Sequence, residues 1–274
     1  MVLSEADKML LKASTAEDTI KALEMGANVN ARGFEGRTKL HDVCLCNIKY
    51  SNEKRCSKIA LILLSNGANI NAQDDHGLTP LMYAEMNNTP LDDLLLKHSA
   101  NISLMDRWGN TVLDRACQAG NEKFVDSLTE HGVNINQKEA SVALIHAAKN
   151  GHLSLVKKLK EMGADINAQD VEGRTAIIAS IDRVEPYPEV VDFLIKNGAD
   201  LSNKNRYRKS PLEVAKEWHH AQIELMLQKG HLQERQEYLA ERKGEKVSSS
   251  AEATTHDSNS PAPSKPNGRD DGGR

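Results

Sequence analysis

A short motif recurs along this chain at nearly constant spacing, and it constrains the fold more than any other feature. The motif is a residue that ends a helix, usually glycine, followed by a short polar stretch such as GANINA at 67–72. Its copies begin at Gly26, Gly67, Ser99, Gly132, Gly163, Gly198 and Gly230, with longer steps after Gly26 and Gly163. A period of about 33 residues is typical of stacked units that cannot bury their apolar faces alone. The sequence therefore predicts a solenoid.

The second unit shows the expected local structure. Thr79 is a good N-cap, and Pro80 falls at the first helical position, where its missing N–H costs nothing. The asparagines at 87–88 end this helix, and Thr-Pro at 89–90 starts another. The second helix ends near Ser99, where the other units carry a glycine suited to a left-handed cap. Each unit is thus expected to be helix, turn, helix and a protruding hairpin-like finger.

The starts of these units are similar to the ankyrin repeat family, whose pattern is T-P-L-H-x-A. The segment GLTPLMYA at 77–84 keeps all of the pattern but the histidine, and GRTKLHDV at 36–43 keeps the histidine but not the proline. Poorer copies begin at Gly109, Val142, Gly173 and Ser210. The resemblance implies an all-α ankyrin-repeat solenoid of stacked helix-turn-helix units with β-hairpin-like fingers.

The resemblance covers residues 1–231, within which three parts are expected. Residues 1–30 lack a Thr-Pro start and should form an N-terminal cap, about 31–204 the repeats, and about 205–231 a polar C-terminal cap. Residues 232–246 are expected to extend as a charged helix. Residues 247–274 are rich in Ser, Pro, Gly and Asp, and are expected to be a disordered tail.

Composition excludes several classes of protein. The net charge is −4 with both signs interspersed, which argues against a nucleic-acid or membrane partner. No apolar run reaches the roughly 18 residues of a spanning helix, and the acidic N-terminus does not resemble a signal peptide. The four cysteines, at 44, 46, 56 and 117, are expected to be free thiols in a reducing compartment. We therefore expect a cytoplasmic protein, or one in the host cytosol if it is a secreted effector.

Catalytic motifs are missing from the sequence: it has no phosphate-binding loop, nucleophile elbow or HExxH pattern. His41 occupies the family's motif histidine, which implies hydrogen bonds to nearby backbone. An insertion of about eight residues within 44–58 brings Cys44, Cys46 and Cys56 near His41, but the order H-x2-C-x-C-x9-C matches no common zinc spacing. We expect no enzyme, cofactor or metal site. An enzyme or metal site in the 44–58 insertion is an alternative.

The family resemblance implies that a partner protein binds the finger tips and inner helices, which form a concave face. The tips are expected at 34–37, 75–78, 107–110, 138–141, 171–174 and 206–209. Three of the ten aromatic residues fall at tips, and exposed Trp, Tyr and Arg often anchor interfaces. The predicted partner-binding residues are Phe34, Glu35, Arg37, Asp75, His76, Leu78, Arg107, Trp108, Asn110, Arg174, Arg206, Tyr207 and Trp218, the last placed on an inner helix.

The predicted function is a non-enzymatic protein-interaction module or adaptor, acting as a monomer. An alternative is a regulator or bacterial effector that masks a host or partner enzyme. Asn71 and Asn167 resemble sites that the asparaginyl hydroxylase of animal cells modifies, although the ordinary role of such asparagines is backbone bonding in the turn. Both interpretations of these asparagines stay open at the level of sequence.

Overall fold

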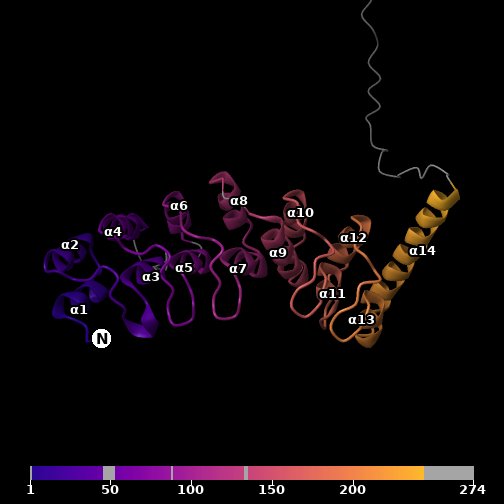
Figure 1. Ribbon diagram of the computed structural model, residues 1–274, viewed down its shortest axis with the longest axis horizontal. Helices are drawn as coiled ribbons and strands as arrows, with labels where there is room; N and C mark the ends of the chain where they lie inside the picture. Colours follow the sequence, from indigo (N-terminus) through magenta and orange to yellow (C-terminus); the bar gives the residue numbers. More distant parts are fainter. Residues whose placement is uncertain (1, 46–52, 88, 133–134, 244–274) are drawn as a thin grey trace, which may run out of the picture. The chain divides into compact units, whose positions relative to one another are not determined.

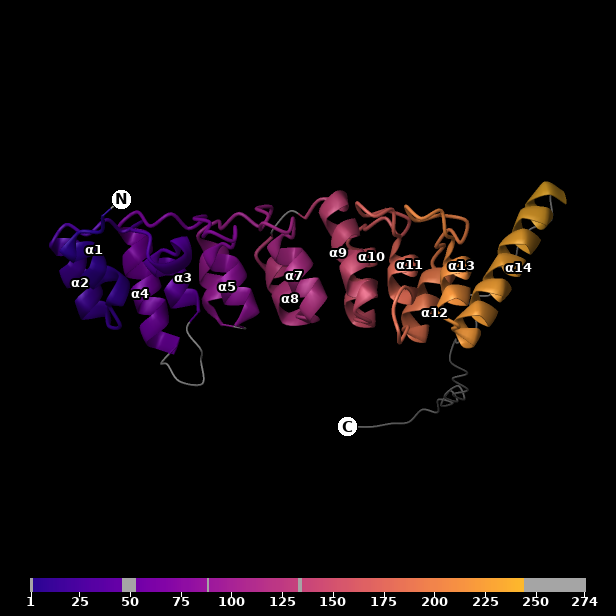
Figure 2. The same ribbon diagram turned by 90° about the horizontal axis from the view of Figure 1, so that it is seen from below.

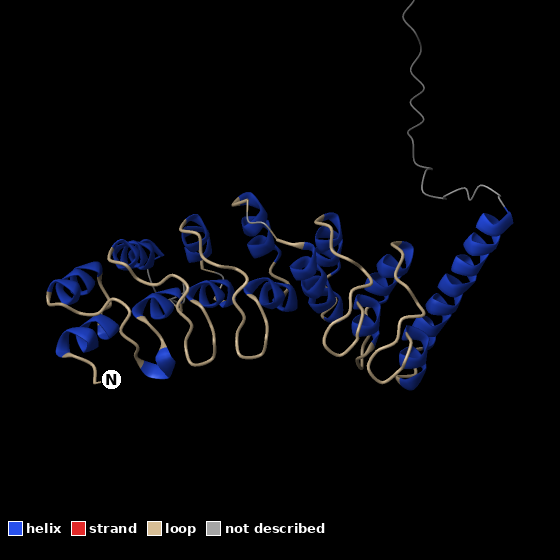
Figure 3. Ribbon diagram, viewed as in Figure 1, coloured by secondary structure: helices blue, strands red, loops and turns tan. Residues whose placement is uncertain are grey.

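The computed structural model describes residues 2–45, 53–87, 89–132 and 135–243. Within these ranges the chain forms helices, turns and loops, and no strand (Figure 3). The chain divides into two compact units, residues 1–231 and 232–274, and in the second the described residues are helical. No helix in the described ranges is both long and apolar enough to cross a bilayer.

Helices alternate between an inner and an outer row, so each repeat contributes a pair (Figures 1 and 2). The inner helices are α1 (Glu5–Lys12), α3 (Lys39–Cys44), α5 (Pro80–Met86), α7 (Val112–Ala119), α9 (Gln137–Lys149), α11 (Ala176–Ile181) and α13 (Pro211–Glu217). The outer helices are α2 (Ala16–Glu24), α4 (Glu53–Ser65), α6 (Leu91–Lys97), α8 (Glu122–Glu130), α10 (Leu153–Glu161), α12 (Pro188–Lys196) and α14 (Ala221–Lys243). One short 3-10 turn, η1 (Phe34–Gly36), precedes α3. The predicted all-α solenoid of helix pairs is confirmed.

Each helix pair packs on the next, which produces one continuous core along residues 10–227. Leu, Ile, Val and Ala supply most of this core, and Phe124 is the one aromatic among the largest fully buried side chains of the described residues. The low aromatic content of the chain follows from this geometry, because the narrow space between parallel helix pairs suits aliphatic side chains.

Short polar side chains start the inner helices as the sequence predicts. The Thr79 hydroxyl accepts a hydrogen bond from the Met82 N–H at 3.3 Å, and Pro80 is the first helical residue. His41 is fully buried, with Nε2 3.0 Å from the Ala72 carbonyl oxygen and 3.1 Å from that of Leu78. Its expected bonding to nearby backbone is confirmed, and burial lowers the pKa of its imidazole.

Four of the five fingers in the described ranges are held closed by an aspartate or asparagine at their first position, which no sequence motif marks; in the finger at 33–37 this position is Gly33. In Asp74, Asp106, Asp170 and Asn205 the side-chain Oδ1 accepts two backbone N–H groups, two and four residues later, at 2.8–3.1 Å. The third residue after each one has a positive φ, and at three of the four positions it is a glycine. These two features recur in four fingers, whereas the finger at 33–37 keeps only the positive φ, at Gly36.

The finger expected at 138–141 is absent, and that prediction is wrong. Residues 137–149 form α9 instead, which begins at the N-cap Asn136. Lys138 lies midway in the sequence between Asp106 and Asp170, at the position that closes a finger, and its side chain cannot accept the two backbone N–H groups. Ser141 replaces the left-handed glycine. The segment lacks both the side-chain acceptor and the left-handed glycine, and it forms the start of α9.

The expectation of free thiols holds for two of the cysteines that the structure describes. Cys44 and Cys117 are buried free thiols, and burial raises the pKa of each. Cys56 is disulfide-bonded, so the expectation of four free thiols is wrong for this residue. Most of the insertion between α3 and α4, residues 46–52, lies outside the described residues, as does the tail at 247–274.

We expect Ser99→Gly to stabilise the protein. Ser99 has a φ of 61°, a left-handed conformation that costs a residue with a Cβ about 1 kcal/mol. The larger backbone entropy of glycine in the unfolded chain offsets part of the gain. The free energy of unfolding, measured by urea denaturation, should rise by about 0.5 kcal/mol. The reverse change Gly198→Ser, at a φ of 82° and with open space around the added Cβ, should lower it.

We expect Asp106→Ala to destabilise the protein by about 3 kcal/mol, because it removes a buried ion-pair partner and the side-chain acceptor of two backbone N–H groups. The Asp106 carboxylate is completely buried, and its Oδ2 lies 2.8 Å from Nε of Arg115. Urea denaturation with the matched variant Asp75→Ala, which truncates an exposed carboxylate in the neighbouring finger, tests the claim. An equal loss of unfolding free energy in Asp106→Ala and Asp75→Ala would contradict this prediction.

Candidate partner-binding surface

The fingers form a row that α9 divides into two groups. In the first group, residues 33–37, 74–78 and 106–110, the N–H of Asp75 donates to the Glu35 carbonyl at 3.0 Å, and that of Arg107 to the His76 carbonyl at 2.9 Å. In the second group, residues 170–174 and 205–209, the Arg206 N–H donates to the Glu172 carbonyl at 2.9 Å. Figure 1 shows the fingers on either side of α9. We call these the N-terminal and C-terminal finger groups.

The space around the finger glycines also shows where the row is divided by α9. A Cβ added at Gly77 would come within 2.9 Å of the Arg107 nitrogen, and one at Gly173 within 3.1 Å of the Arg206 nitrogen. A Cβ at Gly109 would meet nothing within 4 Å. The glycines are therefore required for close approach only where another finger follows.

Each predicted aromatic tip is exposed and is covered on one face by an arginine. Phe34, Trp108 and Tyr207 are 75%, 58% and 63% exposed. The guanidinium carbon lies 5.5 Å from the ring centroid for Arg37 over Phe34, 4.2 Å for Arg107 over Trp108 and 4.9 Å for Arg206 over Tyr207. Cation–π attraction favours these paired orientations.

Trp108 has more such neighbours than the other two rings. The His76 ring, from the preceding finger, stacks on it with centroids 6.2 Å apart. The Arg115 guanidinium, from α7, lies 5.7 Å from its centroid and is itself fixed by the buried carboxylate of Asp106. The indole is thus exposed but held on several sides, so binding through it loses little side-chain entropy.

Several other predicted residues use their polar groups within the fingers. Arg174 pairs with Asp170 at 2.8 Å and with Glu172 at 3.2 Å. Arg37 lies 3.8 Å from the Glu35 carboxylate. These cations are already neutralised, and they contribute shape more than free charge to the surface.

Leu78 and Trp218 differ from their predicted placement. Leu78 is 7% exposed and belongs to the core, so it does not present its side chain to a partner. Trp218 is the C-cap of α13 and not part of the helix, and its Nε1–H donates to Asp182 at 3.1 Å. It lines a cavity of about 470 Å³ together with Tyr207, so the structure brings these two predicted residues to one site.

The remaining predicted residues lie on the N-terminal group. Asp75 and Arg107 are exposed, and His76 is partly exposed with its Nε2 4.0 Å from Glu35. Asn110 accepts a hydrogen bond from Gln118 of α7 at 3.1 Å. These contacts join the finger tips to the inner helices in one surface.

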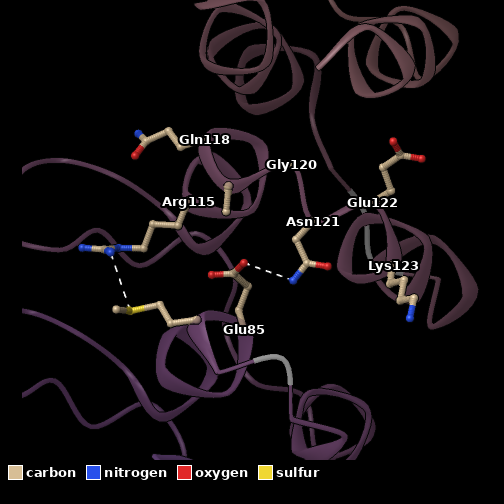
Figure 4. Close-up of a pocket in the computed structure, with 9 residues that line it drawn as sticks. Glu85, Arg115, Gln118, Gly120, Asn121, Glu122 and Lys123 are labelled. Atoms are coloured by element: carbon tan, nitrogen blue, oxygen red, sulfur yellow. Dashed lines mark hydrogen bonds between the residues drawn. The ribbon is translucent and has the colours of Figure 1, made fainter. Parts of the chain in front are cut away.

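A larger cavity, of about 840 Å³, lies beyond the fingers among the ends of α5 and α7 and the start of α8 (Figure 4). No sequence motif marks this place. Arg115 connects it to the tips, since its Nη1 lies 3.7 Å from the sulfur of Met86, which lines the cavity and is 53% exposed. Trp108, Arg115 and Met86 therefore form a continuous strip from finger tip to cavity.

His146 of α9 and the finger asparagines Asn71 and Asn167 have structural partners. His146 Nδ1 lies 3.1 Å from the amide nitrogen of Gln118, and burial lowers the pKa of its imidazole. Asn71 accepts from the Asn101 N–H, and Asn167 accepts from the Asp200 N–H, which links consecutive units. Modification of these asparagines stays a prediction. In the described ranges no group of three or more His, Cys, Asp or Glu could hold a metal ion.

Known proteins resemble this chain along most of the repeat region. A family model described as ankyrin repeats (3 copies) matches residues 48–139 and 144–236. The B-cell lymphoma 3 protein homolog of Mus musculus is 31% identical over 163 residues, 57% of this chain and 36% of that protein. The nuclear factor NF-kappa-B p105 subunit of Gallus gallus is 31% identical over 153 residues, 53% of this chain and 16% of that protein. The matched parts are thus less than half of either relative.

Solved structures support the same assignment. The ankyrin repeat domain of human ASB11 superposes with a TM-score of 0.59 at 25% identity, covering 77% of this chain and 91% of that one. The ankyrin repeat domain of Bcl-3 gives a TM-score of 0.60 at 24% identity, over 77% and 93%, which shows the fold. Ankyrin repeat domains are in general non-enzymatic and bind proteins. Since the family model matches more than half of its residues, this chain belongs to the ankyrin repeat family.

Proposed function

We propose that this chain is a non-enzymatic protein-interaction module whose partner binds the finger tips and the adjoining inner helices. The observation that supports this most is Trp108, a large apolar ring that is 58% exposed yet held by Arg107, His76 and Arg115. An exposed Trp costs solvation free energy that the fold does not recover, and preorganised Trp residues are common interface hot spots.

The N-terminal finger group is the main docking surface in this proposal. It has three linked fingers, two exposed aromatic tips and the continuous strip from Trp108 to Met86. The C-terminal group has two linked fingers and contributes Tyr207 and the cavity beside Trp218. A partner that covers both groups must cross the place where α9 replaces a finger, so its contact there is with helix and not with finger tips.

A regulator or effector that masks one enzyme would use this same surface. The two functions differ in what is bound, not in how the chain binds it. The alternative of an enzyme or metal site in the 44–58 insertion has no supporting cluster among the residues that the structure describes around it.

We expect Trp108→Ala to weaken partner capture without unfolding the chain. Loss of a central hot spot costs about 2 kcal/mol, roughly a 30-fold loss of affinity. Tyr207→Ala should weaken capture less, because its finger group is smaller. The measurement is quantitative pull-down from cell lysate with mass spectrometry, with thermal unfolding of each variant recorded alongside.

Leu61→Ala is the matched control, since it truncates an exposed apolar side chain on the outer helix α4. Its capture should equal that of the unmodified chain. Undiminished capture by both Trp108→Ala and Tyr207→Ala would mean that the partner binds another face.

A further inference from the structure

The cavity among α5, α7 and α8 is a built site that the finger surface does not explain. Gly120 ends α7 in a left-handed conformation with a φ of 76°, and Asn121 then caps α8 by accepting the Phe124 N–H at 3.2 Å. This sharp turn leaves a hollow of about 840 Å³ against the end of α5. The lining includes Glu85, Met86, Arg115, Gln118, Asn121 and Lys123.

Glu85 is a buried carboxylate that points into this cavity (Figure 4). The residue is 3% exposed, and its Oε1 accepts a hydrogen bond from the Asn121 amide at 3.2 Å. Its other oxygen, Oε2, has no hydrogen bond or ion pair with any residue that the structure describes, and it is not fully buried itself, so it faces the open cavity. A buried carboxylate with one neutral donor is unfavourable, and burial accordingly raises its pKa.

The two cationic side chains in the cavity lining, Arg115 and Lys123, do not bond to the Glu85 carboxylate. Arg115 donates from Nε and Nη2 to the buried Asp106 carboxylate, at 2.8 and 2.5 Å. Its charge also attracts the Glu85 carboxylate, but this attraction offsets only part of the effect of burial on the Glu85 pKa. The ammonium group of Lys123 points away from Glu85 in Figure 4. The fold therefore holds an anionic group at the wall of an open cavity and bonds no cation of its own to it.

We propose that this cavity binds a basic side chain of the partner protein, with its ammonium or guanidinium group on the Glu85 carboxylate. This inference rests on the proposed function and adds the chemistry that one part of the surface selects. A charge-assisted bond to a buried carboxylate is among the strongest polar contacts available to an interface.

The surroundings suit a long cationic side chain. The volume lies in the range of ligand pockets, roughly 300–1,000 Å³. Exposed Met86 at the wall offers apolar contact to an aliphatic stem. Glu122 also lines the cavity, but its carboxylate accepts a hydrogen bond from the Ser154 hydroxyl. The charge of Arg115 is offset by Asp106, and Lys123 points away, so the Glu85 carboxylate is the group left for a ligand. A cation is therefore favoured over an anion here.

The cavity adjoins the finger surface through Arg115 and Met86. Met86 contacts Arg115, and Arg115 contacts the Trp108 ring, so a segment covering the indole reaches the cavity along α5 and α7. A partner that presents an apolar residue to Trp108 and a basic residue to Glu85 satisfies both sites.

The test is a titration of the full chain, isotopically labelled and followed by two-dimensional NMR, with n-butylammonium and with ethylguanidinium as side-chain probes at constant ionic strength. We expect saturable shifts centred on residues 85–86 and 118–123 for at least one probe, at concentrations of about 10 mM, as for a weak single contact. Which probe binds more tightly distinguishes a lysine from an arginine site. Neutral n-butanol should give no such shifts.

Glu85→Gln should abolish these shifts or weaken the affinity at least tenfold. Because it removes an unpaired buried charge, this variant should be at least as stable as the unmodified chain in urea denaturation. Glu130→Gln, on the exposed side of α8, is the matched control and should leave the titration unchanged.

Two outcomes would overturn the proposal: no localised shifts in the unmodified chain with either cation, or equal shifts in the Glu85→Gln variant. The first needs no variant, so it holds even if Glu85→Gln fails to fold. If Trp108→Ala still loses its partner in that case, the proposed function survives and only the cavity is misassigned. If the titration succeeds while both aromatic variants retain the partner, the cavity binds cations but the partner uses another face.

Discussion

The hydrogen bonds that one short side chain makes to the backbone in four of the five described fingers are the constraint on which the binding surface depends. Asp74, Asp106, Asp170 and Asn205 each close a tight turn, and each closed finger offers a carbonyl or N–H to its neighbour. The helix pairs would stack without them, because the core is aliphatic and continuous. The aromatic tips would not be held in place, because a finger has almost no core of its own.

Where both this side chain and the left-handed glycine are missing, at residues 138–141, the surface changes character. Lys138 cannot accept the two N–H groups that an aspartate accepts, and the segment starts α9 with an Asn136 cap instead. The finger row then divides into two groups, and Gly109 faces open space rather than another finger. Two substituted positions in a repeat, Lys138 and Ser141, thus alter the continuity of the whole surface, since each finger is supported only by its neighbours.

The two proposed contact points carry costs that the fold alone does not explain. Trp108 leaves a large apolar ring in water, and Glu85 buries a carboxylate without a bonded cation. Both lie on one strip that passes through Arg115, whose own charge is committed to Asp106. Locally unfavourable groups that share a surface are typical of binding sites, because the partner supplies what the free chain lacks.

The sequence by itself determined the repeat, the helix starts and the aromatic tips. The repeat period, the cap at Thr79 and the exposure of Trp108 follow from local rules that each unit obeys independently. The sequence also contains the substitutions that remove one finger, Lys138 and Ser141. Only the hydrogen bonds of the other fingers show that these two positions control whether a finger forms. The cavity at Glu85 was decided by tertiary structure alone, because Glu85 and Asn121 are far apart in the sequence and meet only when two repeats stack.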